Sequence, residues 1–129
     1  MRWPPASLVP HYLVLQAVTI AVWWLVMWLV PAARAPFVVA GLPDSTLFAF
    51  VVPDVLVLVV GSLLAAKAVR AQDERARPLL WLLLGAVGYA TLWCIGTNIA
   101  SGSGFWSTAV MTPACVAMGW AVARCEPRR

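Results

Sequence analysis

Apolar residues along this chain fall into four long runs, separated by short polar or proline-containing stretches. A helix needs about 20 apolar residues to cross a bilayer, and each run reaches or approaches that length. The few polar residues inside the runs recur at helical spacing. The pattern therefore predicts four membrane-spanning helices, over residues 11–30, 46–69, 79–100 and 105–123.

Composition supports this interpretation and limits the class of protein. Of the 129 residues, 63% are hydrophobic and 11% are charged, whereas a soluble domain is about 25% charged. The four runs use most of the chain, so no room is left for a soluble domain. We expect one integral membrane domain over residues 1–129, an all-α, four-helix transmembrane bundle.

A cleaved signal peptide is the alternative interpretation of residues 1–33, where an apolar run is followed by small residues. The run is longer than a usual signal-peptide core, and prolines rather than a basic cluster precede it. These two features favour a retained first span.

Basic residues predict the orientation. With four spans, the two terminal segments and residues 67–78 share one side of the membrane and hold eight of the nine Lys and Arg residues. The opposite side holds only Arg34. Because basic residues accumulate on the cytoplasmic side, both termini are expected in the cytoplasm. The net charge of +4 is thereby explained without a nucleic-acid partner.

The second run carries Asp54, the only acidic residue inside any apolar run. A charged group at the membrane centre costs about 3 kcal/mol on insertion scales, so it needs a partner, a proton or a wet cavity. Pro53 allows two registers. In the first, which Ser45 as a good N-cap favours, the helix begins at Asp44 or Ser45 and Pro53 kinks it. In the second, the helix begins at Pro53.

Polar side chains on the other spans are expected to meet Asp54. In the first span Tyr12, Gln16, Thr19 and Trp23 share one helical face, which we expect to be the buried face. Depth matching at the rise of a helix extends this set to the other spans. The predicted polar layer, or ligand site, consists of Asp54, Gln16, Thr19, Tyr89, Thr91, Asn98 and Thr112.

Such a layer has two interpretations. It could bind a small ligand or a proton, or it could hold the bundle together by hydrogen bonds. The second is favoured because no span offers a basic partner, and one acid alone does not support acid–base catalysis.

Other chemistry is sparse. No nucleophile–base pair, paired carboxylates or phosphate-binding glycine loop occurs in the sequence, so we expect no catalytic residue and lean against an enzyme. His11 lacks a second ligand at metal spacing, so no metal or other cofactor is expected. The odd number of cysteines forms no disulfide framework. Cys125, beside the last span, is either a lipid acceptor or, as we favour, a silent thiol.

Two stretches, LFAFVVPDVLVLVVGSLLAA and PLLWLLLGAVGYATLWC, carry a resemblance. They resemble the amino-terminal membrane region of bacterial proteins assigned to the isoprenylcysteine carboxyl methyltransferase family. That family's methyl-donor site lies in a carboxyl-terminal part with histidine, arginine and glutamate motifs, and nothing here matches them. The resemblance implies an accessory or stand-alone membrane module without transferred catalytic residues.

These observations leave three hypotheses for function. The first is a non-enzymatic structural or partner-binding module in the lipid bilayer, with a membrane-protein partner or a second copy of the chain. The second is a small transporter or lipophile-binding protein that uses Asp54. The third is a membrane subunit of a lipid-modifying methyltransferase-like enzyme. The expected location is the bacterial cytoplasmic membrane, as a multi-pass protein.

Overall fold

A computed structural model describes residues 8–125. The described chain is all-α, and four of its helices are long and apolar enough to cross a membrane. The predicted number and order of long apolar helices are thus confirmed, and their ends lie within a few residues of the expected positions. The elements are α1 (Val9–Leu29), η1 (Pro31–Arg34), α2 (Asp44–Phe48), α3 (Val51–Pro53), η2 (Asp54–Val60), α4 (Gly61–Arg70), α5 (Ala76–Ser101) and α6 (Phe105–Arg124).

The second span is one irregular helix, built from α2, α3, η2 and α4. It begins at Asp44, as the favoured register requires, but the predicted side-chain cap is wrong. Pro43 occupies the N-cap position without a capping bond, and Asp44 lies in the first turn, where its negative charge suits the helix dipole. The helix is interrupted before Pro53, and η2 then has wider, π-helical turns. Pro53 contributes to this irregularity because it has no N–H to donate.

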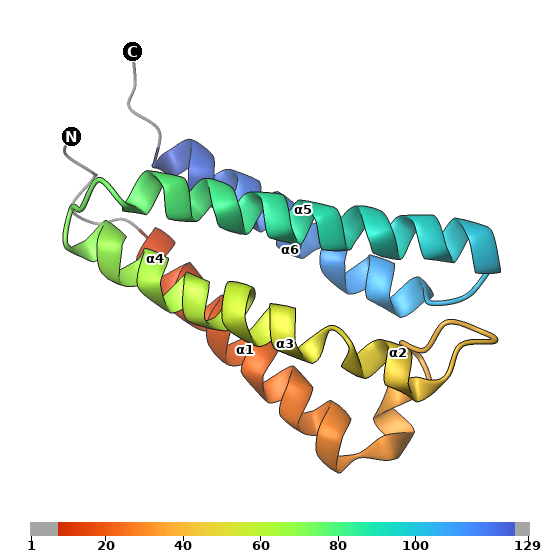
Figure 1. Cartoon of the computed structure of the whole chain (residues 1–129). Helices are drawn as coiled ribbons and strands as arrows, with labels where there is room; N and C mark the ends of the chain where they lie inside the picture. Colours follow the sequence, from red (N-terminus) through yellow and green to blue (C-terminus); the bar gives the residue numbers. More distant parts are fainter. Residues whose placement is uncertain (1–7, 126–129) are drawn as a thin grey trace.

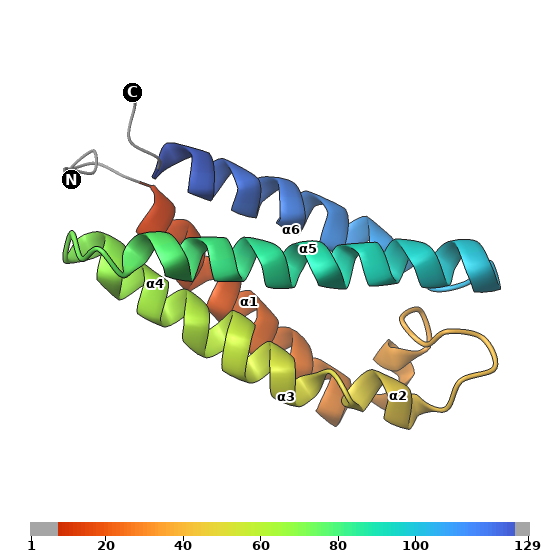
Figure 2. The same cartoon turned by 45° about the horizontal axis from the view of Figure 1, so that its top comes forward.

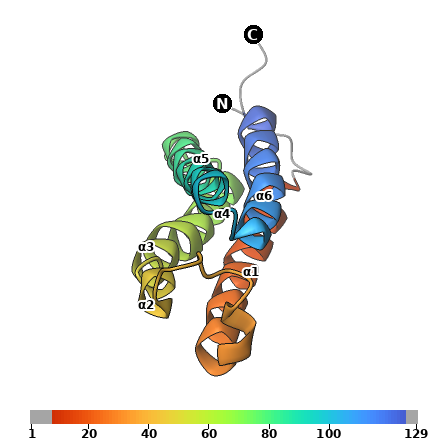
Figure 3. The same ribbon diagram turned by 90° about the vertical axis from the view of Figure 1, so that its right-hand side faces the viewer.

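The four spans form two hairpins. One consists of α1 and the second span, and the other of α5 and α6, which are joined by a tight turn containing two glycines with positive φ. The hairpins lie together where α1 begins and α6 ends, and they diverge toward the opposite end (Figures 1 and 2). Figure 3, from the divergent end, shows α5 and α6 above the second span and α1.

The end of the bundle where α1 begins and α6 ends is its closed end, and it contains the buried core. Small residues there let the two hairpins approach each other. Gly61 of α4 is buried, and a Cβ atom added there would lie 3.3 Å from Cδ2 of Leu83 on α5. Other side chains of this core are fully buried, and they include Leu13, Ala65, Leu80, Leu83, Met118 and Ala121.

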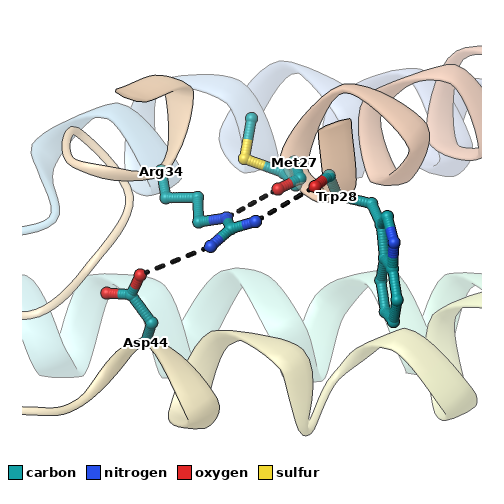
Figure 4. Close-up of polar contacts among 4 residues, drawn as sticks. All are labelled: Met27, Trp28, Arg34 and Asp44. Atoms are coloured by element: carbon teal, nitrogen blue, oxygen red, sulfur yellow. Dashed lines mark hydrogen bonds and ion pairs between the residues drawn. The ribbon is translucent and has the colours of Figure 1, made fainter. Parts of the chain in front are cut away.

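Arg34 fastens the connection between α1 and α2 (Figure 4). Its Nε atom donates to the carbonyl oxygen of Met27 at 2.6 Å, and Nη2 donates to that of Trp28 at 3.1 Å. Nη1 lies 3.7 Å from Oδ2 of Asp44, and the guanidinium carbon lies 4.9 Å from the ring centroid of Phe48. One side chain thus satisfies carbonyls at the end of α1 and contacts the start of the second span.

The connecting segment also reaches the other hairpin. The amide of Ala40 donates to Oγ of Ser103, in the turn between α5 and α6, at 2.9 Å. Residues 31–43 therefore link the two hairpins at the end where these diverge.

Candidate functional site

A cavity of about 360 Å³ lies between the two hairpins. Its volume falls within the range of about 300–1,000 Å³ that is typical of small-molecule sites. All four spans and residues 37–43 contribute to its walls. The lining comes from α1 (Tyr12, Leu15, Gln16, Thr19, Ile20, Trp23, Trp24), the connecting segment (Phe37, Val38, Val39, Leu42, Pro43), the second span (Thr46, Leu47, Phe50, Asp54, Leu58), α5 (Val87, Ala90, Trp93, Cys94) and α6 (Ser107, Val110, Met111, Ala114).

The walls are mainly aromatic and aliphatic. Aromatic rings meet at several points around the cavity: Trp23 and Phe37 have centroids 5.5 Å apart, and Phe50 and Trp93 have centroids 4.8 Å apart. Among the lining residues, Asp54 has the only carboxyl group, and none is Lys, Arg or His. The cavity thus combines a large apolar surface with one acidic group.

Asp54 is half-buried at the start of η2 and lines this cavity. Nε1 of Trp24, on α1, donates to its Oδ2 at 3.1 Å. No described residue donates to Oδ1. Since the described residues contain no buried polar side-chain atom that lacks a partner, Oδ1 is accessible rather than sealed in the protein.

The predicted polar stripe of α1 also faces the cavity. Tyr12, Gln16, Thr19 and Trp23 are all lining residues. The hydroxyl of Tyr12 donates to Oε1 of Gln16, and Nε2 of Gln16 donates at 3.0 Å to Oγ of Ser62, which is fully buried on α4. These bonds tie α1 to α4 beside the cavity.

The expectation that this stripe is the buried face of α1 needs correction. The buried side chains of the helix lie on the neighbouring face and include Leu13, Ala17, Trp24 and Met27. Thr19 is exposed, although it lines the cavity. The stripe faces a cavity because the hairpins diverge, whereas the neighbouring face packs against the second span.

Two other predicted residues point away from the cavity. Tyr89 of α5 is 70% exposed, on a surface that faces lipid if the helices span a membrane. Thr112 of α6 is also exposed, and its hydroxyl donates to the carbonyl oxygen of Thr108 at 2.8 Å. A threonine bonded to its own helix needs no polar layer.

Thr91 and Asn98 serve the contact between α5 and α6 instead. Thr91 is buried, and its hydroxyl lies 2.7 Å from the carbonyl oxygen of Val87 and 3.2 Å from that of Met111. Nδ2 of Asn98 donates to the carbonyl oxygen of Ser103 at 3.0 Å, in the turn between these helices. The structure therefore brings Gln16 and Thr19 to the cavity of Asp54, but not the predicted residues of α5 and α6.

Trp24 is the residue of the site that the sequence pattern did not identify. A signal existed, because a buried carboxylate needs a donor and indole N–H is a donor without acceptor capacity. Trp24 follows Trp23 but does not lie on the polar stripe of α1, so the spacing of polar residues did not identify it as the donor to Asp54.

The remaining reactive groups offer no second site. His11 is exposed in the first turn of α1. Cys125 is buried just beyond α6, which raises the pKa of its thiol to about 11. Burial favours a silent thiol over a lipid acceptor. Within residues 8–125, no group of three or more His, Cys, Asp or Glu residues could hold a metal ion.

The candidate site is thus an aromatic-rich cavity with one carboxyl group, between two helical hairpins. Comparison of the chain with protein-family models, with curated proteins and with solved structures gave no match.

Proposed function

We propose that this protein is a small integral membrane protein that binds a lipophilic molecule in the cavity between its four spans, with Asp54 as the polar anchor. The observation that carries the proposal is the cavity of about 360 Å³, with its largely apolar walls and single carboxyl group. Ligand sites commonly combine apolar walls with a few placed polar groups. A ligand would also supply the dispersion contacts that the lining atoms lack.

Binding can be tested with diphenylhexatriene, a rod-shaped neutral fluorophore, and the protein in lipid nanodiscs. Energy transfer from tryptophan to the probe should contain a saturable part, above the linear part that comes from probe dissolved in lipid. Ala90→Trp places a bulky ring in the cavity wall of α5 and should abolish the saturable part. Ala21→Trp, at an exposed position of α1 outside the lining, is the matched control and should retain it.

Saturable transfer that survives Ala90→Trp would contradict the proposal. So would the absence of saturable transfer, in the unmodified protein, both for this probe and for its trimethylammonium derivative. Tryptophan emission of each variant without probe serves as the reference, because both substitutions add an indole.

The hydrogen bond between Trp24 and Asp54 supports a second candidate, a structural or partner-binding module. This bond joins α1 to the second span, so Asp54 could serve to hold the bundle. A purely structural role predicts that Asp54→Asn keeps both the fold and the protein's activity in the cell, because an amide oxygen still accepts from Trp24. Purification in mild detergent would show whether a partner or a second copy accompanies the chain.

A further inference from the structure

The charges around the cavity do not balance. Asp54 is its only acidic residue, and no basic side chain lines it. Nε1 of Trp24 donates to Oδ2 of Asp54, whereas Oδ1 of Asp54 accepts no hydrogen bond from a described residue. Arg34, the basic residue of the segment that follows α1, is engaged by carbonyls and by Asp44. An ionised carboxylate among mainly apolar walls is costly unless a positive charge accompanies it.

Aromatic rings surround the same region. The indole of Trp24 donates a hydrogen bond to the carboxyl group of Asp54. The ring centroids of Trp24 and Trp23 are 4.5 Å apart. On the opposite wall, the ring of Phe50 contacts that of Trp93. Ring faces attract organic cations within about 6 Å, most strongly where water is excluded. A carboxylate together with such rings is complementary to an ammonium group that carries an apolar body.

Resting on the proposed function, we infer that the ligand of this cavity is a lipophilic cation, and that it enters sideways from the bilayer between α1 and α6. The ammonium group lies at Oδ1 of Asp54, and the apolar body fills the space between the hairpins.

The contacts around the cavity identify the entrance. The side between the second span and α5 is closed by Phe50 against Trp93. Residues 31–43 close the cavity at the divergent end of the bundle. Within this segment, the amide of Ala40 donates to Oγ of Ser103.

Between α1 and α6 the described contacts lie toward the closed end. There the ring of Tyr12 is 6.2 Å from that of Trp120, and its hydroxyl is 3.5 Å from the carbonyl oxygen of Ala114. About one turn toward the divergent end, Leu15 and Val110 line the cavity and are still 65% and 53% exposed. The cavity therefore approaches the outer surface of the bundle at these two side chains.

A matched pair of probes tests the charge of the ligand. Diphenylhexatriene and its trimethylammonium derivative share one fluorophore, and the second adds a fixed positive charge. In nanodiscs of neutral lipid, the cationic probe should show saturable energy transfer at a lower concentration than the neutral probe. Asp54→Asn should weaken the cationic probe roughly 30-fold or more, as for loss of one partner of a buried charge pair. The neutral probe should change less than threefold.

Asp44→Asn is the control acid, since Asp44 is exposed and outside the lining, and it should change neither probe. Equal affinity for the two probes, or a cationic probe insensitive to Asp54→Asn, would overturn the inference while the proposed function stood. Failure of both probes to saturate would overturn the proposed function itself.

The association rate of the cationic probe tests the position of the entrance. Leu15→Trp combined with Val110→Trp should slow association of the cationic probe at least tenfold in stopped-flow mixing. Val116→Trp, at a position of α6 that is 70% exposed and outside the lining, should leave the rate unchanged. An unchanged rate in the double variant would overturn the lateral route.

Discussion

At the scale of single residues, Trp24 and Asp54 depend on each other. Trp24 is only 6% exposed, and a buried indole N–H without an acceptor would be destabilising. Asp54 supplies the acceptor and gains a donor among the mainly apolar walls of the cavity. Hydrogen bonds to ionised groups are stronger than neutral ones. The pair therefore combines a structural bond with a carboxyl oxygen that stays available to a ligand.

Replacing Trp24 by Phe should cost about 1 kcal/mol of unfolding free energy through loss of this bond, beyond any loss of ring packing. The measurement is reversible unfolding in mixed micelles of mild detergent and dodecyl sulfate. Trp28→Phe is the matched control, because Trp28 is 67% exposed and its ring likewise contacts Phe48.

A double-mutant cycle separates the bond from the packing. In an Asp54→Leu background the cost of Trp24→Phe should fall to the packing loss or below it, because the substitution then removes an indole N–H that has no acceptor. Equal costs in both backgrounds would show that the two residues are not coupled.

Sequence reasoning identified which residue was unusual but not what it contacts. Asp54 stood out because an acid in an apolar run is expensive, and the stripe containing Gln16 and Thr19 follows from helical spacing. The predicted layer failed for Thr91 and Thr112 because a threonine can bond to a carbonyl of its own helix, which no spacing reveals. Trp24, the hydrogen-bond partner of Asp54, lies outside the polar stripe of α1, on a face that otherwise carries apolar residues.

At the scale of elements, the second span combines features of both registers that the sequence allowed. It starts at Asp44, yet it is interrupted at residues 49–50 and resumes just before Pro53. The proline accounts for a break, and the residues on either side of the break, Leu47, Phe50 and Asp54, all line the cavity. Packing of this kind is tertiary, so the sequence left the position of the break open.

The segment between α1 and α2 should loosen when Arg34 is replaced by Gln. The substitution removes two hydrogen bonds to carbonyls and one ion pair, so amide hydrogen exchange should accelerate across residues 35–43. Global stability should change by about 1 kcal/mol or less, since the pair with Asp44 is solvent-exposed on one side and such pairs contribute little.

Asp44→Asn removes the ion pair alone and should accelerate exchange much less than Arg34→Gln. If the two variants behave alike, the bonds to Met27 and Trp28 do not fasten the segment. Hydrogen exchange with mass spectrometry, in nanodiscs, measures both.

At the scale of the whole molecule, the four spans were predictable and their divergence was not. Length and hydropathy define a span whichever way it faces. In an apolar bundle the pattern does not distinguish a buried face from an outer face: Leu13 is fully buried, whereas Val18, which lies outside the cavity lining, is 52% exposed. The resemblance to the methyltransferase-like membrane region stays a prediction.

Orientation is the property of the whole molecule that follows most directly from its charges. The start of α1, the connection between α4 and α5, and the end of α6 lie at one end of the bundle (Figure 1). Of the basic residues counted in the sequence, Arg2, Arg128 and Arg129 lie outside the described residues. Among the described basic residues, Lys67, Arg70, Arg75, Arg77 and Arg124 belong to this end, and Arg34 belongs to the opposite end.

We therefore expect the connection between α4 and α5 to lie in the cytoplasm and residues 31–43 to lie outside, because positively charged connections stay on the cytoplasmic side. Two exposed positions, Glu74 and Ala40, can each be changed to Cys in a variant whose native cysteines are replaced. A membrane-impermeant maleimide applied to intact cells should label Ala40→Cys, and should label Glu74→Cys only after lysis. The reverse pattern would contradict the orientation. With residues 31–43 outside, the cavity lies toward the outer half of the bilayer, so a ligand entering between α1 and α6 would come from the outer leaflet.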